Sequence, residues 1–157
     1  MPVEFPFGKH KGKTVEWIFF HDPGYVWWLI QERVELRGAV RARFEQLVQR
    51  ASPLRIPGLC PWCNTRPITR MFSTLHISGG LAGVSFDCDE CEAQGGSLST
   101  PSVPSFYTPD RFRSYDKTGA DIMIGAIKHA YFGSRSARMT QKRMEEFFDN
   151  PDNFVSS

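Results

Sequence analysis

Four cysteines constrain this chain more than any other feature. They form two pairs, Cys60 with Cys63 and Cys88 with Cys91, and two residues separate the members of each pair. Two thiolates at this spacing can face one ion across a tight backbone turn, and two such turns complete the tetrahedral ligand set that zinc prefers. A site filled by four thiolates has no open position for water. The spacing therefore predicts one structural Zn²⁺ bound by all four cysteines.

Other uses of the four cysteines stay open. Two disulfides would need an oxidising compartment, and the chain starts without a charged and then apolar leader. An iron site or redox-active thiols would also satisfy the spacing. We expect zinc because one metal accounts for all four cysteines at once. We expect a cytoplasmic protein without a membrane span, because no apolar run approaches the roughly 20 residues that a span requires.

The segment between the cysteine pairs fits a β-hairpin. A strand-like run extends from Pro67 to Ile77, Gly79-Gly80 could turn the chain, and Val84-Ser85-Phe86 is a second apolar stretch. The hairpin with its two cysteine turns predicts a zinc ribbon over residues 56–96. Trp62 lies between two predicted ligands, so its ring should project outward, where it could stack on a base or contact a partner.

The N-terminal segment predicts a tight basic turn. Val3, Phe5 and Phe7 alternate with polar or turn residues, and Gly8-Lys9-His10-Lys11-Gly12-Lys13 follows them. Glycine permits a positive φ and leaves backbone N–H groups uncovered, so this turn could cradle a phosphate while its lysines supply charge. A solvated turn that is merely basic is the alternative.

Three helices are expected after this turn, within residues 1–55. Thr14 can cap the first, and Asp22-Pro23 can start the second. The third carries an apolar stripe that ends before Pro53, and most of its arginines lie off that stripe. We expect Trp17 and Trp28 to pack in the core.

The C-terminal part predicts two more helices. Residues 93–109 are rich in Gly, Ser, Thr and Pro, which indicates a linker or surface loop over 97–117. Apolar stripes then recur within residues 118–157, the first ending at Gly133 and the second at Asn150-Pro151. The expected fold class is α+β: a small N-terminal hairpin-plus-helices module, a four-cysteine zinc ribbon and two C-terminal helices.

Two blocks in the first third of the chain resemble a known domain. Phe7-Gly8-Lys9-His10-Lys11-Gly12-Lys13-Thr14, with Asp22-Pro23-Gly24-Tyr25-Val26-Trp27-Trp28-Leu29, is similar to the C-terminal domain of exodeoxyribonuclease X-like proteins over residues 4–50. In that family the module accompanies a DnaQ-type exonuclease domain, which implies a nucleic-acid context. Here the motif begins almost at Met1, so we expect a binding role for Lys9, Lys11 and Lys13 to carry over, without catalysis.

Residues 58–132 have a weaker similarity to phage restriction alleviation proteins of the Lar type. It rests on Leu59-Cys60-Pro61-Trp62-Cys63, on Val84 to Gly96 with the second cysteine pair, and on Ala126 to Tyr131. Those proteins pair a ribbon with a downstream helix. Asn64 and Glu92 stand where that family usually has glycine, and the helix lacks its Trp-Asn ending. The similarity implies a phage-like origin.

The residues do not group as an enzyme site requires. The one dense acidic cluster is interleaved with the predicted zinc ligands, the four histidines are scattered, and no cysteine is spare. The net charge of +2 does not by itself indicate nucleic acid. We nevertheless expect a non-enzymatic zinc-ribbon protein that binds nucleic acid, DNA more than RNA, through Lys9, His10, Lys11, Lys13, Trp62, Arg66 and Arg70. The alternative is an adaptor or inhibitor of a host nucleic-acid enzyme, such as a restriction or defence nuclease, that docks through the C-terminal helices.

Overall fold

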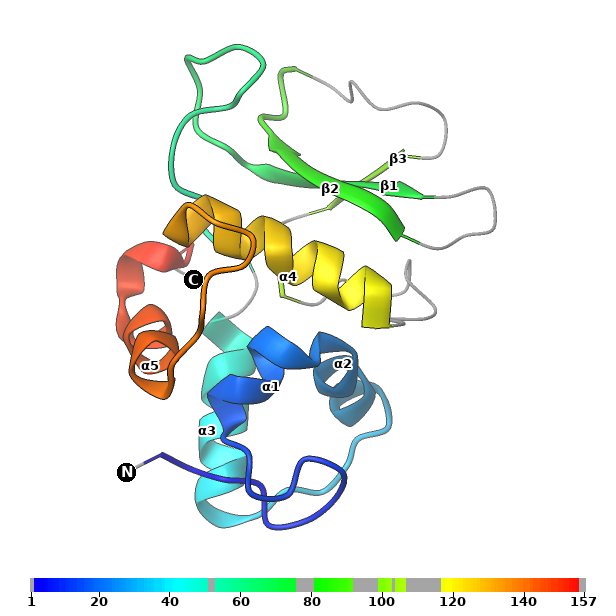
Figure 1. The fold of residues 1–157 in the computed structure, drawn as a ribbon, viewed down its shortest axis with the longest axis vertical. Coiled ribbons are helices and arrows are strands. Elements are labelled where there is room, and N and C mark those ends of the chain that lie inside the picture. The colour runs from blue at the N-terminus through cyan, green and yellow to red at the C-terminus, as the bar shows by residue number, and fades with distance from the viewer. Residues whose placement is uncertain are drawn as a thin grey trace.

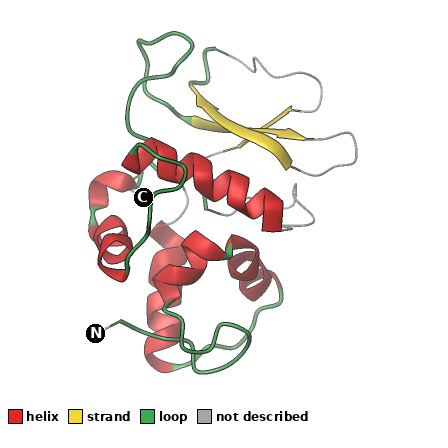
Figure 2. Ribbon diagram, viewed as in Figure 1, coloured by secondary structure: helices red, strands yellow, loops and turns green. Residues whose placement is uncertain are grey.

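The computed structural model describes residues 2–50, 53–75, 81–91, 99–102, 104–106 and 117–155, and all statements below concern these residues. It is an α+β fold, as the sequence predicts (Figure 2). The helices are α1 (Val15–His21), α2 (Pro23–Gln31), α3 (Gly38–Arg50), α4 (Lys117–Phe132), α5 (Gln141–Asp149) and the 3₁₀ turn η1 (Pro151–Asn153). The strands are β1 (Arg70–Leu75), β2 (Leu81–Asp87) and β3 (Ser99–Ser102).

The helix boundaries follow the predicted capping residues. The Trp17 N–H donates to Thr14 Oγ1 at the start of α1, and the Tyr25 N–H donates to Asp22 Oδ1 at the start of α2. Gly133, with φ +78°, follows α4, where a residue without Cβ tolerates the left-handed conformation. Local capping chemistry therefore places these ends, because each cap satisfies backbone N–H or C=O groups that the helix leaves unpaired.

The sheet is antiparallel with the strand order β2-β1-β3. Met71 in β1 lies opposite Phe86 of β2 and Ser102 of β3. The hairpin of β1 and β2 confirms the sequence prediction, whereas the turn proposed at Gly79-Gly80 lies outside the described residues. Below, "sheet region" means these strands with the two cysteine turns, and "helical region" means α1 to α5.

Helix α4 lies between the sheet and the other helices (Figure 1). It contacts β2 on one side and α1 on the other, and α5 also packs against α1. The N-terminal turn lies at the end of the molecule farthest from the sheet (Figure 1). The C-terminal segment returns to the start of the sheet region, where the Arg55 N–H donates to the Asn153 carbonyl and Tyr131 Oη donates to the carbonyls of both residues.

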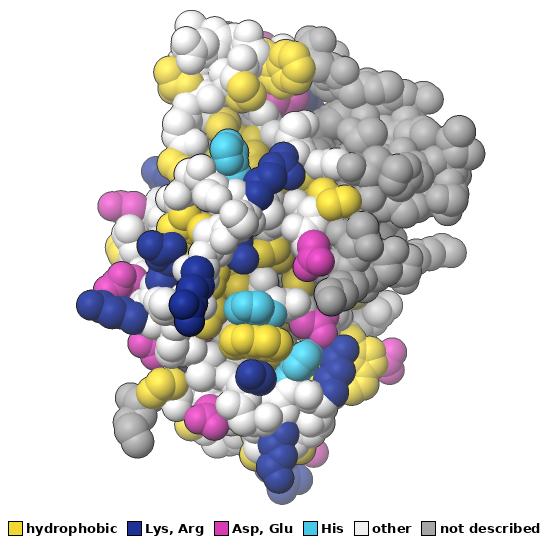
Figure 3. All heavy atoms as spheres, in the orientation of Figure 1, with side chains coloured by type: hydrophobic (Ala, Val, Ile, Leu, Met, Phe, Trp, Pro, Cys, Tyr) yellow, Lys and Arg dark blue, Asp and Glu magenta, His cyan; other side chains and the backbone are white. Residues whose placement is uncertain are grey.

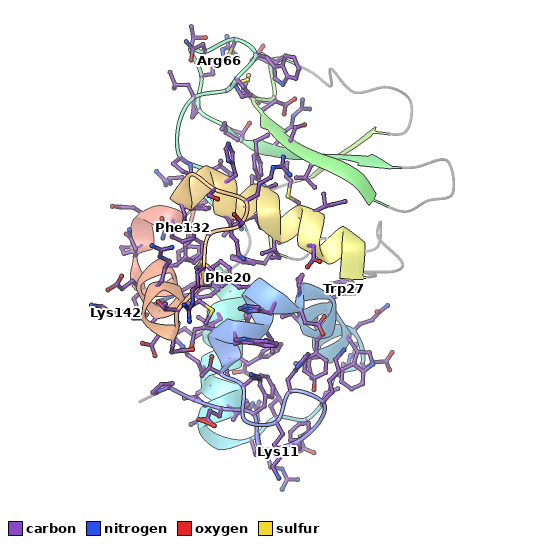
Figure 4. All side chains as sticks on the ribbon, in the orientation of Figure 1. Lys11, Phe20, Trp27, Arg66, Phe132 and Lys142 are labelled. Atoms are coloured by element: carbon purple, nitrogen blue, oxygen red, sulfur yellow. The ribbon has the colours of Figure 1, made fainter. Side chains whose placement is uncertain are left out.

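The core is a cluster of aromatic rings contributed by distant parts of the chain. Phe20 of α1 lies edge-on to Phe106, Phe147 and Phe148, with ring centroids 4.9 to 5.8 Å apart. Figure 4 labels Phe20 in this interior position. Aromatic pairs in such geometry stabilise by about 0.5 to 1.5 kcal/mol beyond the burial of their area. The apolar stripes of both C-terminal helices are buried in this core.

Two expectations from the sequence are wrong. Residues 97–117 are not simply a linker, because Ser99–Ser102 form β3 and Phe106 is fully buried in the core. The low hydrophobicity of this segment gave no indication of a strand, because β3 is specified by its pairing with β1. Trp28 is not a core residue: it is 47% exposed. Trp17 is partly buried and packs against the core, close to expectation.

Candidate metal centre and basic end

The four cysteine sulfur atoms converge on one point. All four Sγ atoms lie within 4.8 Å of one another. Cys60 Sγ lies 3.7 Å from Cys91 Sγ, and Cys63 Sγ lies 3.8 Å from Cys88 Sγ. A tetrahedron with metal–sulfur bonds of about 2.3 Å has edges of about 3.8 Å, so the spacing fits a single tetrahedral ion. The cysteines are free thiols and could hold one metal ion.

The first cysteine turn is built by local hydrogen bonds. The Asn64 N–H donates to the Cys60 carbonyl, and the Cys60 N–H donates to the Arg66 carbonyl, each over 2.8 Å. Asn64 has φ +55°, in the left-handed region where glycine is usual and asparagine is the best tolerated substitute. The departure from glycine noted in the sequence is thus compatible with the same turn.

An ion pair with a buried carboxylate stabilises the second cysteine turn. Arg70 donates from Nε and Nη2 to the two carboxylate oxygens of Asp87, at 3.0 and 2.9 Å. Asp87 is buried and directly precedes Cys88, and Arg70 lies opposite it across the β1–β2 pairing. We therefore assign Arg70 a structural role, although the sequence placed it among the nucleic-acid contacts.

Hydrogen bonds in the two turns shift the pKa values of the thiols in opposite directions. Bonds from the Thr65 side chain and from the backbone N–H groups of Thr65 and Arg66 lower the pKa of Cys63 to about 6. Hydrogen bonding with the Cys88 sulfur, together with burial, raises the pKa of Cys91 to about 12. Four sulfur atoms this close resist full ionisation on their own, whereas a bound dication favours all four thiolates.

The N-terminal turn has the predicted backbone. The Phe5 N–H donates to the Lys13 carbonyl and the Gly12 N–H to the Phe5 carbonyl, each over 2.9 Å. Gly8 and Gly12 have φ values of +81° and +84°, as a tight turn requires. However, the N–H groups of Lys11, Gly12 and Lys13 all donate to carbonyls within the turn. Any phosphate contact here must therefore rely on side chains more than on a cradle of backbone N–H groups.

The three lysines of the turn differ in their surroundings. Lys9 Nζ lies 3.0 Å from Asp22 Oδ2 and 5.5 Å from the centroid of the Tyr25 ring, yet its side chain is 63% exposed. Lys13 Nζ lies 5.1 Å from the centroid of the Trp17 ring. Lys11 is exposed and forms no ion pair among the described residues. Figure 4 shows Lys11 at the outer limit of the turn.

His10 is a packed residue of this turn, not a free contact. Its Nε2 lies 2.9 Å from Asp22 Oδ2, and its side chain is only 14% exposed. The imidazole lies between two rings, 5.2 Å from Trp17 and 4.8 Å, edge-on, from Tyr25. Burial opposes ionisation of Asp22, but hydrogen bonds from His10 and Lys9 hold the pKa of this carboxyl below its usual value. His10 thus links the turn to α1 and α2.

An aromatic row that the sequence did not identify continues from His10 along α1. The His21 imidazole stacks on the Trp17 indole with centroids 4.4 Å apart and planes 7° from parallel. Burial, with a smaller contribution from Lys128 and Lys13, lowers the pKa of His21. The spacing of four residues puts these two side chains on one helix face and was the available sequence signal. Figure 3 shows basic, histidine and apolar side chains intermixed over this end of the molecule.

The predicted nucleic-acid contacts do not form one surface. Figure 4 shows Arg66 and Lys11 at opposite ends of the long axis. We call the N-terminal set the basic end (Lys9, Lys11, Lys13 with Tyr25 and Trp28) and the other the cysteine-turn end (Leu59, Trp62, Arg66). Trp62 is 56% exposed, as expected, whereas Arg66 forms an exposed ion pair with Glu90 at 3.1 Å.

No described helix combines the length and the apolar character needed to cross a membrane. Within the described part of the chain, the four cysteines are the one cluster of three or more side chains that could hold a metal ion.

Comparison with known proteins gives no match, either to a family model, to a curated protein or to a solved structure. The likenesses to exodeoxyribonuclease X-like and Lar-type proteins therefore stay predictions from the sequence.

Proposed function

We propose that this protein is a non-enzymatic zinc-ribbon protein that binds nucleic acid through its basic end. Zinc is supported by the donor set, because four thiolates at edges of 3.7 and 3.8 Å suit a tetrahedral Zn²⁺. The ion would be held by Cys60, Cys63, Cys88 and Cys91, and its chemistry would be structural. It would hold the two cysteine turns at one end of the hairpin.

The observation that carries nucleic-acid binding is the composition of the basic end. Three lysines project from one short turn, and Trp28 beside it is 47% exposed. Cations bind phosphates and exposed aromatic rings bind bases, so this pairing of residue types is typical of nucleic-acid surfaces. The resemblance to the exodeoxyribonuclease X-like module favours DNA. Arg70 and His10 are left out of the proposed contacts because both are engaged inside the protein. Trp62 and Arg66 are left out because they belong to the cysteine-turn end, at the opposite end of the molecule (Figure 4).

A binding role without catalysis agrees with the state of the acidic side chains. Asp87 is paired with Arg70, and Glu90 is paired with Arg66. A hydrolytic Mg²⁺ site needs several carboxylates free to face one ion. Incubation with DNA and RNA in the presence of Mg²⁺ or Mn²⁺ should therefore leave both substrates intact.

Salt dependence of binding tests the proposal. Fluorescence anisotropy with labelled DNA and RNA at several salt concentrations should show affinity that falls as salt rises. Replacing Lys9, Lys11 and Lys13 together by alanine should lower the slope of log affinity against log salt by about 2.7 on duplex DNA or about 2 on a single strand.

Single variants control for folding and for bulk charge. Lys11→Ala removes a lysine that forms no ion pair among the described residues and should reduce the slope by about 0.7 to 0.9. Lys142→Ala removes another exposed lysine, on α5 and away from the basic end in Figure 4, and should change the slope little. Equal effects of the two variants would contradict a specific role for the basic end.

A second candidate function is protein docking at the cysteine-turn end. Leu59 and Trp62 are 51% and 56% exposed there, and neighbouring Asp89 and Glu90 are acidic. The C-terminal helices are no longer the expected docking face, because their apolar stripes are buried. An adaptor or inhibitor of a nucleic-acid enzyme would then bind its partner with little loss of affinity at high salt, whereas affinity for phosphates falls as salt rises.

A further inference from the structure

Trp28 has an unusual position for the largest apolar side chain. It lies in α2, and the inner face of its indole stacks on Tyr25, with centroids 5.4 Å apart and planes 23° from parallel. Tyr25 is itself buried and packs edge-on against Phe5 at 6.1 Å. A buried ring thus supports the indole from below, and much of Trp28 stays in solvent. The support fixes the indole without covering it.

The neighbouring large ring at this end contacts several other side chains. The Trp17 indole has His21 stacked at 4.4 Å and the Lys13 ammonium 5.1 Å from its centroid. By contrast, Tyr25 is the one ring in contact with Trp28 among the described residues. Trp28 is therefore the open aromatic platform of the basic end.

One cation of the turn lies beside the same support. Lys9 Nζ is 5.5 Å from the centroid of Tyr25, the ring on which Trp28 stacks. Lys11 and Lys13 follow in the same turn. A planar group stacked on Trp28 and carrying an attached phosphate would meet positive charge at its edge, and a nucleotide has both features.

Stacking on Trp28 selects the form of the nucleic acid. In a duplex each base is stacked between its neighbours and offers only its edges to a protein, so an exposed ring can stack only on an unpaired base. Helix α2, the element that carries Trp28, contains no Lys or Arg with which to contact phosphates in a groove or to read base edges. The chemistry of this end therefore suits single strands better than duplexes.

We propose that the basic end binds single-stranded nucleic acid, with one base stacked on the exposed face of Trp28 and adjacent phosphates on Lys9 and Lys11. This inference rests on the proposed nucleic-acid-binding function and specifies its ligand.

A strand without bases separates stacking from charge. The full-length, zinc-loaded protein is titrated by anisotropy with labelled oligothymidylate, with an abasic strand of equal length and with a hairpin duplex. Trp28→Ala should weaken binding of oligothymidylate on the order of 5- to 150-fold, the range that corresponds to loss of one base stack. Binding of the abasic strand should change less than about twofold, because its phosphates meet the same lysines.

Matched variants complete the test. Trp62→Ala removes a comparably exposed indole at the cysteine-turn end and should leave oligothymidylate affinity unchanged. Trp28→Phe keeps a ring and should lose less affinity than Trp28→Ala. Thermal unfolding of each variant verifies the fold.

The possible results separate this inference from the function on which it rests. If Trp28→Ala binds oligothymidylate as tightly as the parent while the triple lysine variant binds weakly, the protein binds nucleic acid but the stacking inference is wrong. Tighter binding of the duplex than of oligothymidylate would also overturn it. If the parent binds none of the three probes, both the inference and the proposed function fail.

Discussion

The sheet region and the helical region are held together by different physical means. In the sheet region, the strands pair beside a four-sulfur cluster that could hold a metal ion. Among the described side chains of this region outside the cysteines, Met71 is the apolar one that is fully buried. In the helical region, rings from α1, α5 and the 104–106 segment interlock in a continuous cluster. The comparison teaches that a bound metal can supply stability to a segment with few buried side chains, whereas a helical bundle depends on its packing.

The two regions also differ in the sequence distance that their contacts span. In the sheet region, the members of each cysteine pair are three positions apart, and the sulfurs that meet across the two turns are 25 and 31 positions apart. In the helical region, Thr14 Oγ1 donates to Gln141 Oε1 over 2.7 Å, and Gln141 Nε2 donates to Glu16 Oε2 over 2.8 Å. Arg43 donates to the other oxygen of Glu16 over 2.8 Å. This network around the buried Glu16 joins α1, α3 and α5, and it forms only when the chain ends meet.

Removal of the metal should have the largest effect, and it should be confined to the sheet region. Structural zinc contributes apparent binding energy on the order of 10 kcal/mol, which the short hairpin cannot replace. A strong chelator, or Cys63→Ser, should therefore expose the amides of β1 and β2 to hydrogen exchange while the helical region keeps its protection. Elemental analysis should find one zinc per chain in the parent. Purified protein without zinc would contradict this difference between the regions. So would hydrogen exchange of the helix amides at the same rate as that of the strand amides after zinc removal.

Truncation of a core ring should have the next largest effect, in the helical region. Phe148→Ala removes a fully buried ring that contacts Phe19, Phe20 and Phe106, so the free energy of unfolding should fall by about 3 to 5 kcal/mol. Phe7→Ala is the control, because Phe7 is 40% exposed and its loss should cost about 0.5 kcal/mol or less. Urea denaturation of both variants measures the difference, and equal losses would argue against this aromatic cluster as the core.

Neutralisation of Glu16 should have an intermediate effect. Glu16→Gln places an NH₂ group against one of two donors, Arg43 or Gln141, so one hydrogen bond to a carboxylate is lost inside the protein. We expect the free energy of unfolding to fall by about 1.5 to 3 kcal/mol in urea denaturation. Glu145→Gln is the control, since Glu145 accepts one longer bond of 3.2 Å from Gln141. A neutral outcome for Glu16→Gln would mean that packing alone joins the three helices.

The smallest expected effect is a pH dependence that originates in the helical region. Because the pKa of His21 is lower in the folded protein than the usual 6.5, its contribution to stability is complete above pH 6.5. The contribution is lost as the pH falls through the lowered folded value. The melting temperature of the parent should therefore decline slightly below pH 6.5, and His21→Gln should flatten that decline. An unchanged profile in His21→Gln would assign the pH dependence to another group.

Local features of this fold were predictable from the sequence. The cysteine spacing predicted the convergence of four sulfurs, and Thr14 and Asp22 predicted the starts of two helices. The positive φ values of Gly8 and Gly12 followed from the basic turn between them. For the helix caps and the glycine turn, the residues that interact lie within a few positions of one another, so chain geometry limits the possible arrangements. The cysteine cluster was predicted from the ligand spacing that a tetrahedral metal site requires.

The surface of the basic end could not be predicted in the same way. Lys9 and His10 both bind Asp22, the N-cap residue of α2, and only the fold brings that carboxylate to the turn. Trp28 was expected in the core because tryptophan is strongly apolar. The helix orientation instead turns its outer face to solvent while Tyr25 is buried.

The sequence by itself determined the helix ends and the glycine turn, because both depend on bonds between near neighbours in the chain, and it indicated the cysteine cluster through a ligand spacing typical of one metal ion. Only the tertiary structure decided which charged groups are buried and which rings stay open. Arg70 and Arg43 resemble surface residues in the sequence, yet both bind buried carboxylates. The physical reason is that burial of a side chain depends on elements that approach from distant positions, and a residue's own neighbours in the chain do not encode that approach.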